Sequence, residues 1–147
     1  MHVVQALVSL GIGGSEMVAV EITEHLRALG HKVTVLAADG PLEGRVNDSG
    51  ASLLDWPIGR KRLGTLRFIR QLRSWLLENQ PDIVHAHSRL PAWICYLALR
   101  KIPKDKRPVF ITSVHGQYSV SSYSAVMARG DQVIAVSDHI RRYTLKN

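Results

Sequence analysis

Apolar residues in this chain form short runs that alternate with segments of helical spacing. Residues 3–8 are almost all apolar and partly β-branched, the pattern of a strand buried on both faces of a parallel sheet. A glycine-rich turn follows at residues 9–14, after which Ser15 is expected to cap a helix that Gly30 ends. Residues 32–38 repeat the strand pattern. This succession of strand, helix and strand is the unit that builds parallel sheets through right-handed crossovers.

The same alternation continues to the end of the chain. Further strands are predicted at residues 51–55, 82–86, 108–113 and 132–136. Further helices are predicted at residues 42–48, 63–78 and 90–100, in a segment ending at Met127, and from Asp138 onward. Strands and helices in this alternation predict a single α/β domain with a Rossmann-like, doubly wound parallel sheet in the strand order 3-2-1-4-5-6. Ligands of such sheets bind where the strand order reverses, here beyond the C-terminal ends of the first and fourth strands.

Composition agrees with one globular domain. The chain has 147 residues, of which 46% are hydrophobic and 21% charged, and it contains one cysteine. No apolar run approaches the roughly 20 residues that a membrane-spanning helix needs. Cys95 lies among apolar residues of a predicted helix, which favours an inert buried thiol over a nucleophile. The absence of a cysteine pair fits a reducing compartment, so we expect a cytoplasmic protein.

The net charge of +7 is less ordinary and implies an anionic partner. Basic residues concentrate at positions 60–73, and no acidic residue lies between Asp55 and Glu78. On the predicted helix, Arg67, Arg70 and Arg73 share one arc and the apolar residues another. We expect this basic helix to contact an anionic membrane surface. The protein would then be a peripheral one at the inner face of the cytoplasmic membrane. No nucleic-acid partner is expected, because no base-stacking platform or binding motif accompanies the charge.

Glycines cluster before the first predicted helix. Gly11, Gly13 and Gly14 precede its N-terminus, where free N–H groups and the helix dipole attract an anion. The dinucleotide fingerprint Gly-x-Gly-x-x-Gly would need a glycine at the position of Glu16, whose carboxylate would repel a pyrophosphate. Nicotinamide binding is therefore disfavoured. A tight structural turn, or contact with a smaller phosphate or a sugar, stays open.

Three histidines lie in or just after predicted strands. His85 and His87 point to the same side of the fourth strand, but no third ligand follows at a metal-binding spacing, so no metal site is expected. His85 is expected to be packed and hydrogen-bonded inside the sheet, whereas His87 lies at the strand end and faces the Gly13-Gly14 turn across the crevice. For His87, position alone leaves functional and structural roles open. His115 follows the fifth strand, where it can donate a hydrogen bond or accept a proton near neutral pH.

Several short segments of this chain occur together in one known family. They are residues 13–16 with the following helix, 29–35, 81–87, 112–116 and 131–137. In this order and at these separations they resemble the retaining glycosyltransferases of family 4, specifically the N-terminal half of their two-domain GT-B fold. The resemblance spans nearly the whole chain.

The resemblance implies an activity and a domain organisation. Members transfer a sugar, here expected to be a hexose, from a nucleotide-sugar to a glycan or lipid-linked acceptor with retention, as in cell-envelope glycan biosynthesis. Residues 1–147 would be the acceptor-side domain, and a second domain that binds most of the donor is absent from this chain. The fragment alone is expected to be inactive, and no cofactor or metal is expected. The competing hypotheses are a nicotinamide-dependent Rossmann protein and a basic membrane-binding or nucleic-acid-binding module without catalysis.

The resemblance also assigns residues. His115 matches the histidine that contacts the transferred sugar and is the expected catalytic residue. The loop near the donor phosphates and the acceptor is expected to comprise Gly13, Gly14 and Glu16. The expected acceptor-binding residues are His87, Arg89 and Tyr118, of which the tyrosine would line the same pocket as His115.

Overall fold

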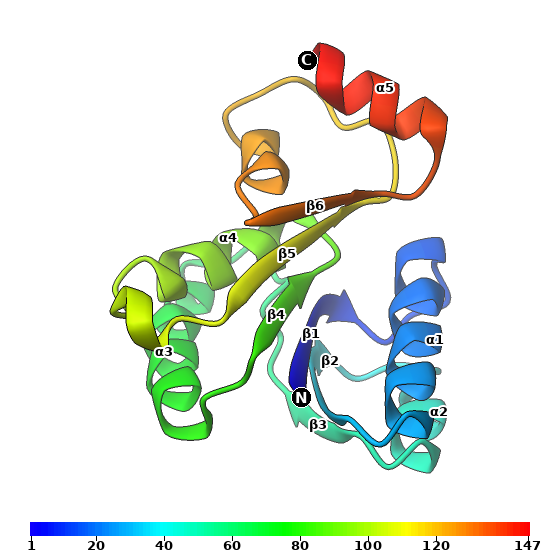
Figure 1. Cartoon of the computed structure of the whole chain (residues 1–147), viewed down its shortest axis with the longest axis vertical. Helices are drawn as coiled ribbons and strands as arrows, with labels where there is room; N and C mark the ends of the chain where they lie inside the picture. Colours follow the sequence, from blue (N-terminus) through cyan, green and yellow to red (C-terminus); the bar gives the residue numbers. More distant parts are fainter.

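Parallel strands form one sheet in the order β3-β2-β1-β4-β5-β6, as the sequence predicts (Figure 1). The strands of this computed structural model, which describes all 147 residues, are β1 His2–Ser9, β2 Lys32–Ala38, β3 Ser52–Asp55, β4 Ile83–Ala86, β5 Val109–Val114 and β6 Gln132–Ala135. The strand order reverses between β1 and β4, which pair in register from Val3 opposite Ile83 to Ala6 opposite Ala86. The predicted α/β fold class is confirmed.

Helices cover both faces of the sheet (Figure 1). The α-helices are α1 Gly14–Ala28, α2 Glu43–Asp48, α3 Arg67–Asn79, α4 Arg89–Leu99 and α5 Asp138–Lys146, and short 3-10 turns lie at Leu63–Leu66, Lys104–Lys106 and Ser124–Ala128. A core of 20 buried residues, including Val4 and Leu72, lies on the side of α3 and α4. A second core of 10 residues, including Val20 and Val35, lies under α1 and α2. Burial on both faces explains why the central strands β1 and β2 are nearly continuous apolar runs.

The first helix begins earlier than its sequence suggests. α1 begins at Gly14, with Gly13 as the N-cap residue, so the prediction of Ser15 as the cap is wrong. The Ser15 hydroxyl instead donates a hydrogen bond to the Glu16 carboxylate over 2.7 Å. Because α1 already begins at Gly14, Ser15 lies inside its first turn and not at the cap position. The predicted stop is confirmed, because Gly30 adopts a left-handed conformation with φ of +81°.

Two predicted helices are partly or wholly 3-10 turns. The helix predicted at residues 63–78 is a 3-10 turn at Leu63–Leu66 that runs directly into α3. In that turn the Thr65 hydroxyl donates to the carbonyl oxygen of Arg60, which holds the loop before α3 against it. The helix predicted to end at Met127 is the 3-10 turn Ser124–Ala128. Short 3-10 turns of this kind commonly begin helices or serve as connectors.

Gly59 marks a close approach between the loop after β3 and strand β1. A Cβ atom on Gly59 would lie 2.5–2.7 Å from atoms of Val8, which is closer than side chains tolerate. Gly59→Ala should therefore lower the free energy of unfolding by about 1–3 kcal/mol through overpacking, measured by urea denaturation. Gly64→Ala is the matched control, since nothing lies within 4 Å of its added carbon. Equal losses in the two variants would contradict the close contact.

Candidate functional site

Three histidines meet at the C-terminal ends of β4 and β5. His85 belongs to β4, His87 follows that strand, and His115 follows β5 directly. The Nδ1 atom of His87 lies 3.1 Å from the Nε2 atom of His115. The ring centroids of His85 and His87 are 4.0 Å apart, and those of His87 and His115 are 5.4 Å apart. These residues form the histidine cluster, next to the point where the strand order reverses.

His85 has the structural role that its position in the strand predicts. It is buried, and its Nε2 atom lies 2.7 Å from the hydroxyl oxygen of Ser113 on β5. Burial lowers the pKa of His85 to about 4, because an imidazolium ion cannot be solvated inside the sheet. His85 is therefore neutral at physiological pH.

His87 is buried more deeply than its position at a strand end suggests. Its side chain is 1% exposed, so the ring does not reach the crevice itself and contacts it only through His115. The Nε2 atom of His87 lies 2.6 Å from Oε1 of Gln5 on β1. Burial, with smaller contributions from His85 and His115, holds the pKa of His87 well below its usual value. His87 thus contacts His115 from the interior of the sheet and holds its ring in place through the contact between Nδ1 and Nε2.

His115 is the histidine of the cluster that stays accessible. It is half-buried, and this burial lowers its pKa, while the carboxylate of Glu16 acts in the opposite direction. This contribution of Glu16 agrees with a first turn of α1 on the same side of the sheet as the end of β5. The prediction that the Gly13-Gly14 turn faces the histidines across the crevice stays a prediction.

Glu16 covers the N-terminus of α1. A Cβ atom on Gly13 would collide with the Glu16 carboxylate, which therefore lies directly over the Gly13 backbone. A carboxylate in this place partly neutralises the positive end of the helix dipole. A substrate phosphate that used these N–H groups would have to displace it. The arrangement disfavours a dinucleotide pyrophosphate, in agreement with the sequence.

Arg89 and Tyr118, both expected at the acceptor site, lie against each other. The guanidinium carbon of Arg89 is 4.9 Å from the centre of the Tyr118 ring and 5.2 Å from that of Tyr123. Its Nη1 atom donates to the hydroxyl of Ser124 over 3.3 Å. Burial raises the pKa of Tyr118. These cation–π contacts fix the arginine at the start of α4 and hold the loop after β5 beside it.

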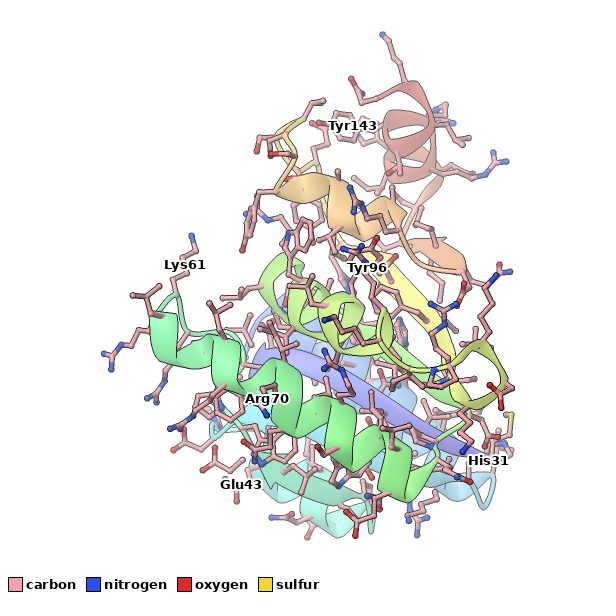
Figure 2. All side chains as sticks on the ribbon, turned by 90° about the vertical axis from the view of Figure 1, so that its left-hand side faces the viewer. His31, Glu43, Lys61, Arg70, Tyr96 and Tyr143 are labelled. Carbon is pink, nitrogen blue, oxygen red and sulfur yellow. The ribbon has the colours of Figure 1, made fainter.

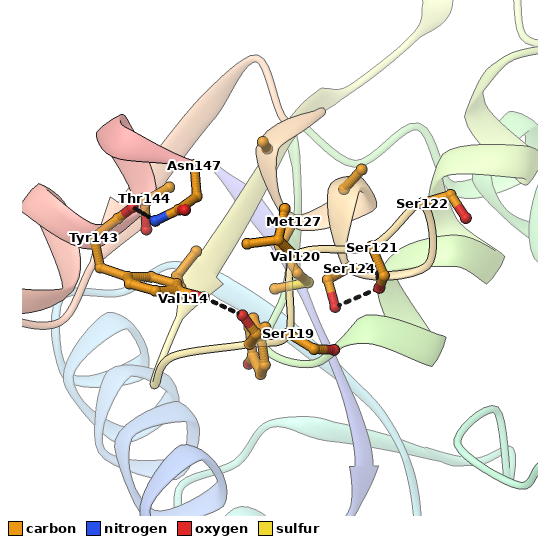
Figure 3. A pocket seen from close by; sticks show the side chains of 13 residues that line it. Val114, Ser119, Val120, Ser121, Ser122, Ser124, Met127, Tyr143, Thr144 and Asn147 are labelled. Atoms are coloured by element: carbon orange, nitrogen blue, oxygen red, sulfur yellow. Dashed lines mark hydrogen bonds between the residues drawn. The ribbon is translucent and has the colours of Figure 1, made fainter.

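A cavity of about 410 Å³ lies beside this loop, and sequence reasoning missed it (Figure 3). Its walls come from the end of β5, the serine-rich loop, the 3-10 turn after that loop, and α5. Val114 and Met127 form part of its apolar lining, and Tyr118 joins it to the neighbourhood of His115. The hydroxyl of Tyr143 on α5 donates to the backbone oxygen of Tyr118 and closes one side. Only the serine-rich composition of the loop hinted at a special segment.

The arginines expected on one basic arc differ in exposure. Arg67 and Arg70 are exposed on α3, and Arg70 is labelled in Figure 2. Arg73 instead donates from Nε and Nη2 to the backbone oxygens of Ala98 and Leu97 over 3.2 and 3.3 Å. It stabilises the C-terminal end of α4, so its placement on the free basic arc is wrong. A sequence cannot show this, because the acceptors belong to a helix that packs beside α3.

Exposed cations and exposed leucines gather around the start of α3. We call this the basic surface, and its members are Arg60, Lys61, Arg62, Leu63, Leu66, Arg67 and Arg70. Leu63 is 90% exposed and Leu66 is 55% exposed. A neighbouring cavity of about 390 Å³ has Arg60, Lys61 and Arg62 on its walls. The surface thus joins positive charge to uncovered apolar side chains.

Other chemistry finds little support. No group of three or more His, Cys, Asp or Glu side chains is placed to hold a metal ion. Cys95 is fully buried, and this raises the pKa of its thiol to about 12, which confirms the predicted inert cysteine. No helix is both long and apolar enough to cross a membrane.

The model of the family described as Glycosyltransferase Family 4 matches residues 12–147. The chain belongs to glycosyltransferase family 4. It is 26% identical over 144 residues to the phosphatidyl-myo-inositol mannosyltransferase of Mycolicibacterium smegmatis, a match that covers 91% of this chain and 37% of that protein. This chain therefore spans well under half the length of that family relative.

Solved structures share the fold of this family 4 chain. A glycosyltransferase from Rickettsia africae superposes with a TM-score of 0.80 at 23% identity, over 99% of this chain and 39% of the other. A lipopolysaccharide outer core galactosyltransferase in its apo form gives a TM-score of 0.73 at 17% identity, over 99% and 42%. At these identities the likeness shows the fold. The predicted recognition of a family 4 domain is confirmed.

Proposed function

We propose that this chain is the acceptor-side half of a nucleotide-sugar-dependent glycosyltransferase that works with retention. The observation that carries the proposal is the family match over residues 12–147. The site supports it, because the half-buried His115 lies just beyond the end of β5, next to the strand-order reversal between β1 and β4, and burial lowers its pKa. In this position His115 can hydrogen-bond a sugar without bringing a positive charge to it. No metal takes part in the proposed reaction.

The proposed partner of this half is a second α/β domain that binds most of the nucleotide-sugar. The chain covers 37% of the mannosyltransferase and 39% of the Rickettsia structure, which leaves ample length for such a domain in those proteins. The active site would lie between the two domains, with His115, Gly13 and Gly14 on this wall. Arg89, Tyr118 and His87 would shape or support the acceptor side.

The proposed substrates are a hexose donor and a glycan or lipid-linked acceptor of the cell envelope. Two similar proteins support this class, one named as a phosphatidyl-myo-inositol mannosyltransferase and one as a lipopolysaccharide outer core galactosyltransferase. The test is transfer of labelled sugar from UDP-hexoses and GDP-hexoses to extracted lipid and glycan acceptors, by this chain joined to its second domain. Failure with every donor, together with tight binding of a nicotinamide dinucleotide, would favour the competing Rossmann hypothesis.

The 147-residue chain alone should fold and show no appreciable transfer. Only one wall of the proposed cleft is present, so the groups that orient donor and acceptor are not assembled together. The measurement is the same transfer assay, run beside the two-domain protein at equal concentration. Comparable turnover by the isolated chain would contradict the proposed division of the site.

We also propose that the basic surface binds the protein to the anionic inner face of the cytoplasmic membrane. Arg67 and Arg70 are exposed there, and Leu63 and Leu66 are uncovered beside them. The apolar arc of α3 is used in the core, where Phe68, Leu72 and Leu76 are buried. Attachment would therefore be chiefly electrostatic, with the two exposed leucines adding apolar contact.

Changing Arg67 and Arg70 together to glutamine should weaken binding to anionic vesicles about 30-fold at low salt. Each basic residue near such a surface contributes about 1 kcal/mol. The measurement is co-sedimentation with phosphatidylglycerol-containing and neutral phosphatidylcholine vesicles. The matched control changes Arg141 and Arg142, which are exposed on α5, and removes the same charge elsewhere. Equal binding by both double variants, or no binding by the unchanged protein, would leave the basic surface as a merely solvated one.

A further inference from the structure

Gln5 is an unusual residue for its place in the sheet. It lies in the middle of β1, where both its neighbours along the strand, Val4 and Ala6, are buried, and it is itself 0% exposed. The amide nitrogen Nε2 of Gln5 is buried without a hydrogen-bond partner. An unpaired buried donor destabilises the fold, whereas an apolar residue of similar size would fit a strand of this kind. The polar contact that this side chain makes is at its other end, the oxygen Oε1.

That other end starts a chain of hydrogen bonds leading to His115. The Oε1 atom of Gln5 can only accept, so Nε2 of His87 carries a proton and donates to it over 2.6 Å. A neutral His87 then has a bare Nδ1, which can only accept. Its partner is Nε2 of His115 at 3.1 Å, so that nitrogen must carry a proton and donate. A neutral His115 is left with an unprotonated Nδ1.

We propose that Gln5 is a positioning residue that acts through His87 to hold His115 in its Nε2-protonated tautomer. The unprotonated Nδ1 of His115 then accepts a hydrogen bond from a hydroxyl group of the bound sugar. The consequence for the sugar rests on the proposed function, but the tautomer does not. If the Gln5 amide were turned over, its NH₂ group would donate to His87, every bond of the chain would reverse, and His115 would present an N–H group instead.

The surroundings of the hydrogen bonds between Gln5, His87 and His115 keep both histidine rings neutral. His85 packs against His87 with ring centroids 4.0 Å apart, and it is held by Ser113. Burial lowers the pKa of His115 more than the carboxylate of Glu16 on α1 raises it. Because His87 is buried, its ring does not take up a second proton, and the hydrogen-bonded row Gln5–His87–His115 stays uncharged. The protons are therefore placed by the acceptor at the far end, which is the oxygen of Gln5.

The first test measures the tautomers of the unchanged 147-residue chain. Long-range ¹H–¹⁵N correlation spectra of histidine-labelled protein distinguish protonated from unprotonated ring nitrogens, and the spectrum of His115→Asn assigns the His115 signals. At pH 7.5 we expect Nε2 to be protonated and Nδ1 unprotonated in both His87 and His115. Protonation of Nδ1 in His115 would overturn the proposal, whether or not the protein transfers sugars.

The second test changes the acceptor. Gln5→Leu removes it and should turn the single His115 tautomer into a mixture in which both forms are detected. Thr34→Val is the matched control, because it removes a similarly buried polar group that lies 2.9 Å from Nε2 of His2 on the neighbouring strand. It should shift the signals of His2 alone.

Two results of the second test would overturn the proposal. One is an unchanged His115 tautomer in Gln5→Leu, and the other is an equal change in Thr34→Val. If Gln5→Leu fails to fold, the spectrum of the unchanged chain still decides, because it must show His115 protonated at Nε2.

Discussion

Replacing His115 with alanine in the two-domain protein should lower kcat about 10²–10³-fold while changing the melting temperature little. The ring is half-buried and lies just beyond the end of β5, so few core contacts depend on it. Its proposed role is a hydrogen bond to the sugar where charge develops, and groups of this kind typically contribute that much to the rate. Steady-state kinetics and thermal denaturation of the same preparation measure the two effects.

A matched control separates the role of this histidine from a general effect. His25→Ala removes an exposed histidine from the last turn of α1, away from the strand ends, and should leave kcat unchanged. If His115→Ala instead lowered the melting temperature with unchanged turnover, His115 would be a structural residue. The proposed catalytic role would then be wrong, although the family assignment would stand.

Acid should destabilise this protein through its buried histidines. His85 has a pKa of about 4 in the fold and about 6.5 when unfolded, so between these values the unfolded chain binds more protons. The free energy of unfolding is therefore highest above the unfolded pKa and falls as the pH drops from about 6.5 to 4. The loss from His85 amounts to about 3 kcal/mol. His87 acts in the same direction, because burial lowers its pKa as well.

Variants identify the source of this pH dependence. Urea unfolding of His85→Gln between pH 7 and 4.5 should show a smaller loss of stability on acidification than the unchanged protein. His139→Gln, which removes an exposed histidine of α5, should show the full loss. If the two variants and the unchanged protein all lost the same free energy, carboxylates rather than buried histidines would govern acid stability.

The sheet could be predicted from the sequence because the pattern that indicates each strand is local and recurs along the chain. Each strand is a short apolar run, and the crossover rule for parallel strands then limits the strand order. The wrong predictions concern the residue at which a helix begins and the short turn before a helix. Ser15 does not cap α1 because the helix already begins at Gly14. The segment before α3 is a 3-10 turn, in which the Thr65 hydroxyl donates to the carbonyl oxygen of Arg60.

The candidate site was predicted only as far as its strand ends. His85, His87 and His115 could be placed at one edge, since parallel strands share a C-terminal edge. The burial of each side chain could not be predicted, because that of His87 depends on how the neighbouring strands pack around it. Gln5 was not singled out, because its partner lies 82 positions away in the sequence. Arg73 was misplaced for the same reason, as its acceptors lie on α4.

Strand β6 leaves one edge of the sheet open, which bears on any experiment at high protein concentration. It pairs with β5 alone, and Val133, Ile134 and Val136 are exposed along it. An unpaired edge with apolar side chains can add a strand from another copy of the chain. The net charge of +7 keeps copies apart only while it is unscreened, and the Debye length shrinks to roughly 3 Å at 1 M salt. Salt should thus release the protein from vesicles and promote its self-association, so each salt concentration in a sedimentation series requires a tube without vesicles.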